Sequence, residues 1–274
     1  MKEPRKRSVA RSGKTGATGA AAVGEKPDRL FVEAVARAFR VLEAYSDSPG
    51  PMSLSEIAAA TGLDKSAAQR LTHTLAKLGY LERASGGVVP GRRILDRTFD
   101  YLRTTPLVHR SIPILADLRR TVKERVDLSL FDDLSMVYLV RMQSKRETFF
   151  AHLIGRRVPT FCTSGGRAVL SHLPEDRMLD ILTRSDRRKY TPRTTTDIPE
   201  IIERVAEVRE TGYSLAVEEL LIGEVAVGVA VLDSKGHPVA AIHIAGSLAE
   251  WSPDEFVKRI GPLAIAAANG LREN

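Results

Sequence analysis

The sequence predicts an α+β protein in which an N-terminal winged helix-turn-helix domain precedes a larger domain of strands and helices. Two amphipathic helical patterns meet between Ser53 and Tyr80, and a short β-hairpin pattern follows them. Beyond the hairpin, β-rich runs alternate with helical patterns but lack the regular order of a doubly wound sheet. These patterns favour a winged helix joined to a second, α+β domain.

Length and composition limit the class of protein. The chain has 274 residues, enough for two domains, and 43% of them are hydrophobic. No apolar run reaches the roughly 20 residues of a membrane span, and no secretory signal pattern lies near the N-terminus. The single cysteine, Cys162, excludes an internal disulfide framework and a cysteine-rich zinc site. We expect a cytoplasmic protein without a cofactor or metal ion.

The net charge of +7 is concentrated in the N-terminal third of the chain. Residues 1–27 hold seven Lys or Arg and two Glu, whereas residues 94–274 hold 25 basic and 25 acidic residues. Between residues 57 and 93, six basic residues accompany two acidic ones. A basic surface binds phosphates in a salt-dependent way, so this distribution points to double-stranded DNA as a partner.

The chain is divided into four expected parts. Residues 1–27 are rich in small and basic residues without a hydrophobic period, which predicts a disordered basic tail. This tail either adds phosphate contacts along the duplex, or aids solubility or reflects an alternative start codon. The winged helix-turn-helix is expected over residues 28–91, a linker helix over 92–105 and the second domain over 106–274.

An amphipathic first helix is expected from Asp28 to Ser46. Its apolar face should close the core of the winged domain, and it is also a candidate surface for a partner protomer. The segment Ser48 to Pro51 then breaks the chain before the helix-turn-helix. The apolar residues of this helix are Phe31, Val32, Val35, Phe39, Val41 and Leu42.

The helix-turn-helix is predicted from the break between its two helical patterns. Gly62 can adopt the left-handed conformation that ends the first helix, and Asp64 can cap the second. One face of the second helix is polar and free of acids, which suits the major groove because Gln and Arg pair with base edges. The alternative is an ordinary helical hairpin with a solvated face. The predicted DNA contacts on this helix are Lys65, Ser66, Gln69, Arg70 and His73, with Gln69 as the base reader.

A β-hairpin completes the expected winged helix. Gly79 to Arg83 forms the first predicted strand, Ser85 to Gly87 the turn, and Val88-Val89 the returning strand. Arg83 and Arg92 flank this hairpin, where their guanidinium groups can contact the phosphate backbone beside the groove. Both residues are therefore predicted to bind DNA.

The second domain is expected to begin after a connecting helix from Gly91 to Leu102. Antiparallel hairpins with added helices predict an α+β arrangement. Further helices are expected at Leu107–Glu124, Ser164–Leu173, Glu175–Thr183, Asp197–Thr211 and Pro253–Leu271, and strands at VDLSLF, MVYLVRM, Glu147–Ile154, VAVGVAVL and VAAIHIA.

Several ordered segments between residues 30 and 272 resemble one known family. The segment LSEIAAATGLDKSAAQRLTHTLAKLGYLER is similar to the DNA-binding domain of the IclR-type (isocitrate lyase regulator) bacterial transcription factors. Further segments resemble that family in the same order: VPTFCTSGGRAVLSHLP, YTPRTTTDIPEI, VRETGYSLAVEE and PVAAIHIAGS. The resemblance implies a dimeric or tetrameric transcriptional regulator whose winged domain is followed by a GAF-like α/β effector-binding domain.

The resemblance also implies an effector site in the second domain. In the family, the segment matching Val158 to Ala168, the start of a DDEE motif and a strand cysteine line this site. Ala216 and Ala226 stand here in place of the Asp and the Cys, so we expect a wider, more apolar cavity. His243 is either a ligand contact or a core histidine. The implied effector-binding residues are Val158, Cys162, Ser164, Gly165, Gly166, Ala216, Ala226 and His243.

The chemistry of this expected site predicts the class of effector. Free N–H groups of residues 164–166 at a helix N-terminus favour a carboxylate. Combined with an apolar cavity, they predict an organic acid with a bulky apolar part, such as a hydroxybenzoate, with smaller keto acids as the alternative. The expected function is repression of a catabolic operon under control of this acid.

The sequence contains no complete catalytic constellation. Cys162 does not lie at a sharp turn between a strand and a helix, where a nucleophile is often presented. The sequence also shows no acidic residue that would orient a catalytic base for it. Thr163 to Arg167 lacks the glycine spacing and the Lys-Ser/Thr ending of a phosphate loop. Glu218 and Glu219 are adjacent, so on a strand they would point to opposite faces and make a poor acid/base pair. We therefore predict that the protein is not an enzyme; a winged-helix platform for protein interactions without an effector is the remaining rival.

Overall fold

The computed structural model describes residues 28–48, 50–143 and 154–272. The chain forms two compact units, divided between Ile94 and Leu95. The expected tail of residues 1–27 and nearly all of the expected strand Glu147–Ile154 lie outside the described residues. Each unit is considered by itself below.

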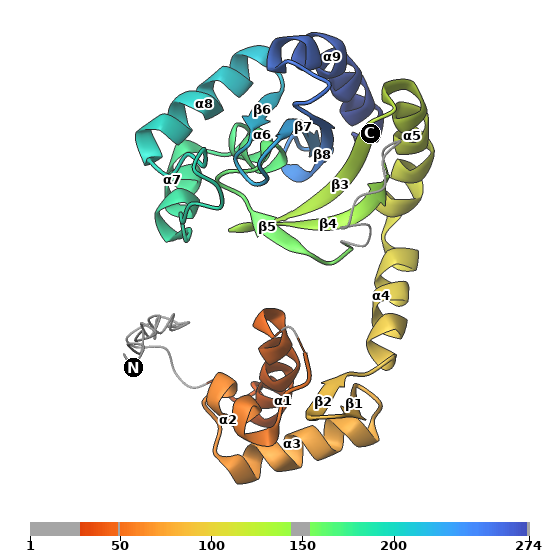
Figure 1. Cartoon of the computed structure of the whole chain (residues 1–274), viewed down its shortest axis with the longest axis vertical. Helices are drawn as coiled ribbons and strands as arrows, with labels where there is room; N and C mark the ends of the chain where they lie inside the picture. Colours follow the sequence, from red (N-terminus) through yellow and green to blue (C-terminus); the bar gives the residue numbers. More distant parts are fainter. Residues whose placement is uncertain (1–27, 49, 144–153, 273–274) are drawn as a thin grey trace, which may run out of the picture. The chain divides into compact units, whose positions relative to one another are not determined.

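The first unit is a winged helix-turn-helix (Figure 1). Its two short strands pair in antiparallel register, and a bridge from Met52 to Val88 adds the segment before the second helix to the hairpin. The elements are α1 (Glu33–Glu43), the 3-10 helix η1 (Ala44–Asp47), α2 (Leu54–Thr61), α3 (Lys65–Lys77), β1 (Leu81–Ala84) and β2 (Gly87–Pro90).

Local hydrogen bonds define the corner between α2 and α3. The Ser53 hydroxyl accepts the N–H of Glu56, and the Glu56 carboxylate accepts the N–H of Ser53 at 2.8 Å, which caps α2 at its start. Helix α2 ends at Gly62, whose φ of 68° is left-handed. The Asp64 carboxylate accepts the N–H of Ala67 at 2.8 Å and caps α3. The predicted roles of Gly62 and Asp64 are confirmed.

The apolar face expected for the first helix closes the core only in part. Val41 is fully buried, but Val35 is 52% and Phe39 59% exposed. Phe39 and Val41 are two positions apart, so they project from nearly opposite sides of the helix. Helix α1 therefore carries a second apolar side that the unit itself does not cover. The core consists of Val41, Met52, Ile57, Ala68, Leu75 and Leu81.

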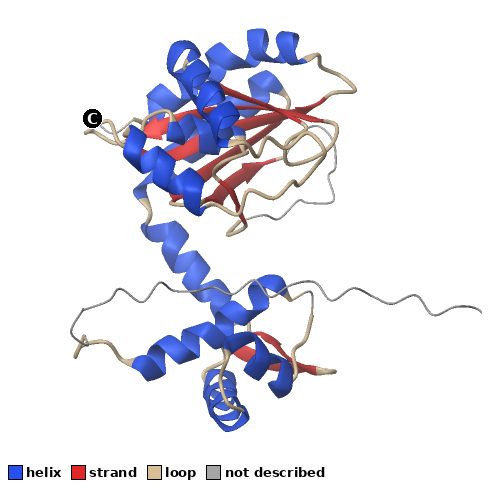
Figure 2. Cartoon of the chain, turned by 90° about the vertical axis from the view of Figure 1, so that its left-hand side faces the viewer, coloured by secondary structure: helices blue, strands red, loops and turns tan. Residues whose placement is uncertain are grey.

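The second unit is built on one antiparallel sheet, drawn in red in Figure 2. Its six strands pair in the order β5-β4-β3-β8-β7-β6. This arrangement confirms the predicted α+β class. The strands are β3 (Arg125–Asp132), β4 (Ser135–Met142), β5 (Arg157–Pro159), β6 (Ser214–Val217), β7 (Glu224–Leu232) and β8 (Pro238–Ser247). Helix α4 (Arg93–Thr104) begins in the first unit and continues into the second. The other helices of the second unit are α5 (Pro106–Val122), α6 (Ser164–Leu170), α7 (Glu175–Arg184), α8 (Ile198–Thr211) and α9 (Pro253–Leu271).

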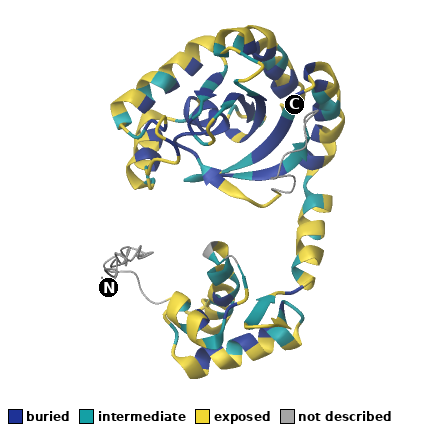
Figure 3. Cartoon of the chain, in the orientation of Figure 1, coloured by how far each residue is buried: buried dark blue, intermediate teal, exposed yellow. Residues whose placement is uncertain are grey.

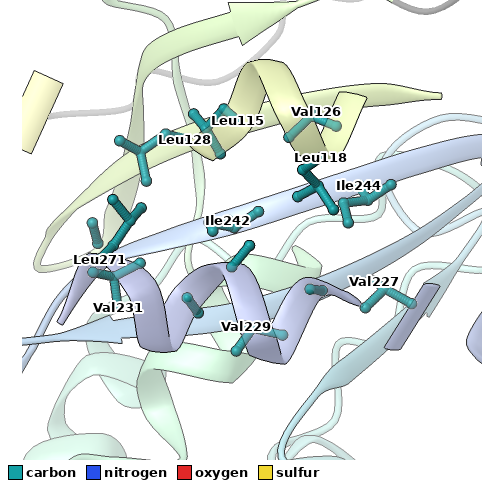
Figure 4. Close-up of a cluster of buried hydrophobic side chains, with 14 of the residues drawn as sticks. Leu115, Leu118, Val126, Leu128, Val227, Val229, Val231, Ile242, Ile244 and Leu271 are labelled. Carbon is teal, nitrogen blue, oxygen red and sulfur yellow. The ribbon is translucent and has the colours of Figure 1, made fainter. Parts of the chain in front are cut away.

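Helices cover both faces of this sheet, and its central strands are buried (Figure 3). Helices α5 and α9 pack on one face, where alternate residues of β7 and β8 such as Val229 and Ile242 meet Leu115 and Leu271 (Figure 4). Helix α6 packs on the other face, and α7 and α8 bury a further apolar cluster around Leu170 behind it.

Glycines allow α6 to lie directly on the sheet. A Cβ atom at Gly228 of β7 would lie 2.3 Å from the backbone carbon of Ser164. A Cβ atom at Gly165 would lie 2.2 Å from the His243 ring. The start of α6 is therefore fixed against β7 and β8 by close backbone contact.

Candidate functional site

The polar face of α3 forms one exposed surface with the wing. The side chains predicted to contact DNA on this helix are all exposed. A groove of about 910 Å³ runs between α3 and the hairpin. No acidic residue is among the described residues that line it, which suits a negatively charged partner. The predicted contacts that line this groove together are Ser66, Gln69, Arg70, His73 and Arg83.

Two other predicted contacts lie outside that groove. Lys65 is exposed at the first position of α3. The Arg92 side chain is 89% exposed and pairs with Glu82 at 3.1 Å. Hydrogen bonds from the backbone N–H and the side chain of Arg92 lower the pKa of the Glu82 carboxyl. Arg92 thus reaches solvent at the base of the wing, where it is tethered by a surface ion pair.

Thr72, at the edge of the predicted DNA face, is not on the surface. Its side chain is buried, and its hydroxyl has no hydrogen-bond partner among the described residues. Thr72 lines the groove together with the apolar residues Met52 and Val88. It therefore forms part of the floor beneath the exposed polar side chains.

In the second unit, five of the eight implied effector-site residues line a single cavity. Ala216 of β6 and Ala226 of β7 are directly opposed in register and are both 8% exposed. Cys162 and Ser164 contribute from the start of α6, and His243 from β8. The fold thus brings five of the eight implied residues together around one cavity.

This cavity is not the wide apolar one that the two alanines predict. Its volume is about 20 Å³. Tyr138 and His243, with ring centroids 5.7 Å apart, line it together with Leu220. The same lining includes Arg125 and Glu224, so large and charged side chains from β3, β4 and β7 surround the space that the alanines leave.

At the start of α6, where a carboxylate is predicted to bind, one backbone N–H and both glycines already make contacts within the chain. Helix α6 has only seven residues. The N–H of Gly166 donates to the Thr163 hydroxyl at 3.2 Å, so this donor is already used. Gly165 packs against His243, and Gly166 packs against Thr160, where a Cβ atom would lie 2.0 Å from the backbone oxygen. Both glycines therefore have a packing role.

His243 is a buried core histidine that also lines the cavity. Its ring nitrogen Nε2 shares a hydrogen bond with the Ser129 hydroxyl. Complete burial lowers the pKa of His243 to about 3, so the imidazole is neutral at physiological pH. His243 is therefore buried in the core and also lines the cavity, and its contact with a ligand stays a prediction.

Cys162 is enclosed and unreactive. Burial, followed by the charge of Glu219, raises the pKa of its thiol to about 12. The thiol therefore stays protonated at neutral pH and is a poor nucleophile. Cys162 contributes a small apolar surface to the cavity and to the cluster behind α6.

A second, larger cavity adjoins the first. Its volume is about 100 Å³. Val158 of β5, another of the eight residues implied for the effector site, lines it. Five residues line both cavities, so the two share a wall. These shared residues are Arg125, Tyr138, Leu220, Leu221 and Glu224, and the larger cavity adds Arg141 and Arg156.

A row of polar residues crosses the sheet beside these cavities. Gly228, His243, Asp127 and Arg141 are opposed in register across β7, β8, β3 and β4. Arg125 donates to Asp127 at 2.9 Å and pairs with Glu224 at 2.7 Å. Burial raises the pKa of the Asp127 carboxyl, and the neighbouring arginines oppose this effect.

Sequence reasoning missed Arg125, Tyr138, Arg141 and Glu224. The available signal was a charged residue inside an otherwise apolar strand run, as at Asp127 in VDLSLF and Arg141 in MVYLVRM. Charges in such runs are rare unless they are paired or functional.

A buried ion pair fixes the start of α6 to the loop after β6. Arg167 and Glu219 are both nearly inaccessible, and their side chains pair directly. Glu219 also accepts the N–H of Thr195 at 3.1 Å. Breaking such a pair leaves an uncompensated buried charge, so removing either partner should destabilise this side of the smaller cavity.

No group of three or more His, Cys, Asp or Glu side chains within the described ranges is arranged to hold a metal ion. Among the helices in the described part of the chain, none has the length and apolarity needed to span a membrane.

Comparison with known families gives matches to both units. Residues 99–271 match the family described as bacterial transcriptional regulator IclR C-terminal. Residues 34–85 match the IclR helix-turn-helix domain. The helix-turn-helix match precedes the C-terminal match, and together the two cover most of the chain.

Named relatives extend over nearly the whole chain. The transcriptional repressor IclR of Escherichia coli is 27% identical over 251 residues, which cover 90% of this chain and 91% of that protein. The p-hydroxybenzoate hydroxylase transcriptional activator of Acinetobacter baylyi is 26% identical over 247 residues, covering 88% of this chain and 91% of that protein.

A solved structure shares the fold. An IclR homologue from Microbacterium hydrocarbonoxydans, complexed with 4-hydroxybenzoate, has a TM-score of 0.71 and 22% identity, with coverage of 87% of this chain and 98% of that one.

Proposed function

Since the chain belongs to the IclR family of bacterial transcriptional regulators, we propose that it is a sequence-specific repressor of a catabolic operon, controlled by a small organic acid. The observation that carries this proposal is the groove of the first unit, where donor side chains of α3 and the wing gather without an acid among the described lining residues. The same chain encloses cavities lined by arginines in its second unit.

We assign base reading to Gln69 and Arg70. Both are exposed on α3 and line the groove, and both side chains can make paired hydrogen bonds to base edges. Lys65 and Ser66 at the start of α3 are placed to reach phosphates, as are Arg83 and Arg92 beside the wing. His73 supplies a further donor one turn along α3 from Gln69.

The DNA-bound form is proposed to contain paired protomers. A single recognition helix covers too few base pairs to select an operator, so two must act on one site. The uncovered side of α1 includes Phe39, which is 59% exposed, and Phe31, just before the helix, is 60% exposed. On α4, Leu95 and Phe99 are 67% and 64% exposed. Large exposed apolar side chains of this kind mark protein interaction surfaces, so both helices are candidates for the pairing.

An aromatic acid such as a hydroxybenzoate is the first candidate effector. The name of one relative, the p-hydroxybenzoate hydroxylase transcriptional activator, associates that protein with aromatic acid metabolism. Because Leu220 and Leu221 line both cavities, movement of these two side chains would join the spaces and make room for a ring.

A compact keto acid is the second candidate, and the size of the cavities favours it. Pockets that enclose drug-sized ligands measure about 300–1,000 Å³. The two cavities, at about 20 and about 100 Å³, are far smaller. A molecule of pyruvate size requires less rearrangement of Leu220 and Leu221 than an aromatic ring does.

The proposal is tested by selecting operator DNA from a random duplex library and titrating it with the full chain by fluorescence anisotropy. We expect binding of the selected duplex at least about 1,000-fold tighter than of random duplex at physiological salt. Hydroxybenzoates and keto acids are then added separately, and one class should weaken operator binding. Specific binding that no acid alters would favour the protein-interaction platform; no preference for the selected duplex would refute the regulator itself.

A further inference from the structure

The proposed effector carries a carboxylate, and we propose that Arg141 and Tyr138 bind this carboxylate in the larger cavity. The inference rests on the organic-acid effector proposed above and places its charged end on β4, away from the start of α6. Both side chains line the larger cavity, and Tyr138 also lines the smaller one.

An irregularity of the sheet brings these two residues to the same face. In the pairing of β3 with β4, Leu128 is opposite Val140 and Ser129 is opposite Tyr138, so Leu139 is an extra residue in β4. In a regular strand, positions 138 and 141 would point to opposite faces. A bulge of this kind redirects side chains, and here it places the Arg141 guanidinium 5.9 Å from the centre of the Tyr138 ring.

Arg141 is buried but poorly compensated. Its side chain is only 4% exposed. Among the described residues, the acid that pairs with it is Asp127, at 3.7 Å, which is too far for a hydrogen bond. The Nε–H of Arg141 has no hydrogen-bond acceptor among the described residues. A buried N–H without an acceptor is unfavourable, and a carboxylate can accept two parallel hydrogen bonds from a guanidinium.

Tyr138 offers a second donor beside Arg141. Burial, followed by the charge of Asp127, raises the pKa of the Tyr138 hydroxyl to about 12. The hydroxyl therefore remains protonated at physiological pH and can donate to an anion. Together the two side chains present a cation and a neutral donor to the larger cavity.

The neighbouring arginine is less suited to this role because it already has partners. Arg125 donates to Asp127 at 2.9 Å and lies 2.7 Å from Glu224. Its charge is thus balanced by two carboxylates, whereas in the described part of the chain Arg141 pairs with the more distant oxygen of Asp127 alone. An incoming carboxylate gains more from Arg141 than from Arg125.

Asp127 should compete with the effector for Arg141. It pairs with Arg141 and is completely buried. Replacing its carboxylate with an amide removes the competing charge, while Arg125 keeps Glu224 as a partner. Asp127→Asn should therefore strengthen carboxylate binding, and Arg141→Gln should weaken it. If Asp127 and Arg141 only stabilised the fold, both variants would change the affinity for the acid in the same direction.

The test is calorimetric titration of the full chain with 4-hydroxybenzoate and pyruvate, each compared with its neutral amide. The wild type should bind one acid at least about tenfold more tightly than the amide, as expected for a charge-assisted contact. Arg141→Gln should lower the affinity for the acid about tenfold or more and remove the preference over the amide. Tyr138→Phe should cause a smaller loss, and Asp127→Asn should raise affinity for the acid.

Two further variants keep the result interpretable. Arg120→Gln makes the same change at a side chain that is 72% exposed on α5, and it should leave acid binding unchanged. Arg141→Lys retains the charge but loses the planar fork of the guanidinium, so it should bind the acid with intermediate affinity. This variant replaces Arg141→Gln in the test if Arg141→Gln does not fold. The folded state of each variant is checked by circular dichroism and thermal unfolding.

Three outcomes overturn the assignment. A folded Arg141→Gln or Arg141→Lys variant with wild-type affinity for the acid would exclude Arg141 while leaving the proposed function intact. Asp127→Asn binding the acid as weakly as Arg141→Gln would indicate a structural role only. If neither acid binds the wild-type chain, the organic-acid effector itself is refuted and this assignment is lost with it.

Discussion

The two units present their candidate residues in opposite ways. In the first unit, Gln69, Arg70 and Arg83 are exposed on a groove without acids in its described lining. In the second unit, Arg125 and Arg141 are largely buried, and carboxylates stand beside them. DNA is a large polyanion that needs an open surface, whereas a small acid must be enclosed to exclude water. Substitutions at the groove of the first unit should therefore change DNA binding alone, and those around the cavities of the second unit should also affect packing.

The largest expected effect is the loss of effector binding on filling the smaller cavity. Ala226→Phe overfills the smaller cavity of about 20 Å³, which shares Tyr138 and Leu220 with the larger one, so it should abolish acid binding in calorimetry. Operator affinity without the acid should stay within about twofold, because the DNA contacts belong to the other unit. Ala249→Phe, at an exposed position of the same unit, is the control. Normal folding with unchanged acid affinity would mean that the pocket lies elsewhere.

The next effect concerns assembly. Phe39→Asp in α1 or Phe99→Asp in α4 places a charge on an exposed apolar surface, so it should prevent pairing without unfolding either unit. Analytical ultracentrifugation should show a wild-type dimer or tetramer at micromolar concentration and smaller species for the variants. A wild-type monomer that binds one half-site with full affinity would contradict the pairing.

A glycine-to-alanine change should reduce stability more in the second unit than in the first. Gly228→Ala would place its Cβ atom 2.3 Å from the backbone of Ser164, so we expect a loss of about 1–3 kcal/mol in the second unit. Gly50→Ala in the first unit meets nothing within 4 Å and should change stability by less than about 1 kcal/mol. Urea unfolding followed by circular dichroism measures both. Equal stability of the two variants would show that α6 can move away from β7.

The smallest expected effects lie on the DNA surface. Gln69→Ala should cost about 1–3 kcal/mol at one or two base pairs, because it removes a base contact. Lys65→Ala should weaken all sequences alike and reduce the slope of log affinity against log salt by about one. Anisotropy titrations on operator and random duplex distinguish the two. Equal losses on both duplexes for Gln69→Ala would remove it as a base reader.

Much of the first unit is predictable because local residues determine it. Gly62 ends α2 and Asp64 caps α3 through contacts within a few residues. The uncovered side of α1 is different, because whether Phe39 faces the core depends on how the helix packs on α2 and α3. Residue periodicity finds an apolar side but not what covers it.

The second unit is predictable in class but not in detail. Strands β5 and β6 have three and four residues, which is too short for alternation to reveal them. The resemblance brings Ala216, Ala226 and His243 to one cavity, as the structure has them. It does not supply Arg141, because the extra residue Leu139 and the pairing with Asp127 depend on strand register.

The central claim is that one chain couples an exposed DNA surface to an enclosed acid site. Linkage requires this coupling to be reciprocal: the factor by which the acid changes the operator Kd must equal the factor by which operator changes the acid Kd. Both are measurable on the same wild-type sample, by anisotropy with saturating acid and by calorimetry with saturating operator. We predict equal factors of about 5-fold to 150-fold, the usual range of such coupling. Acid binding that is unaffected by operator would contradict the account.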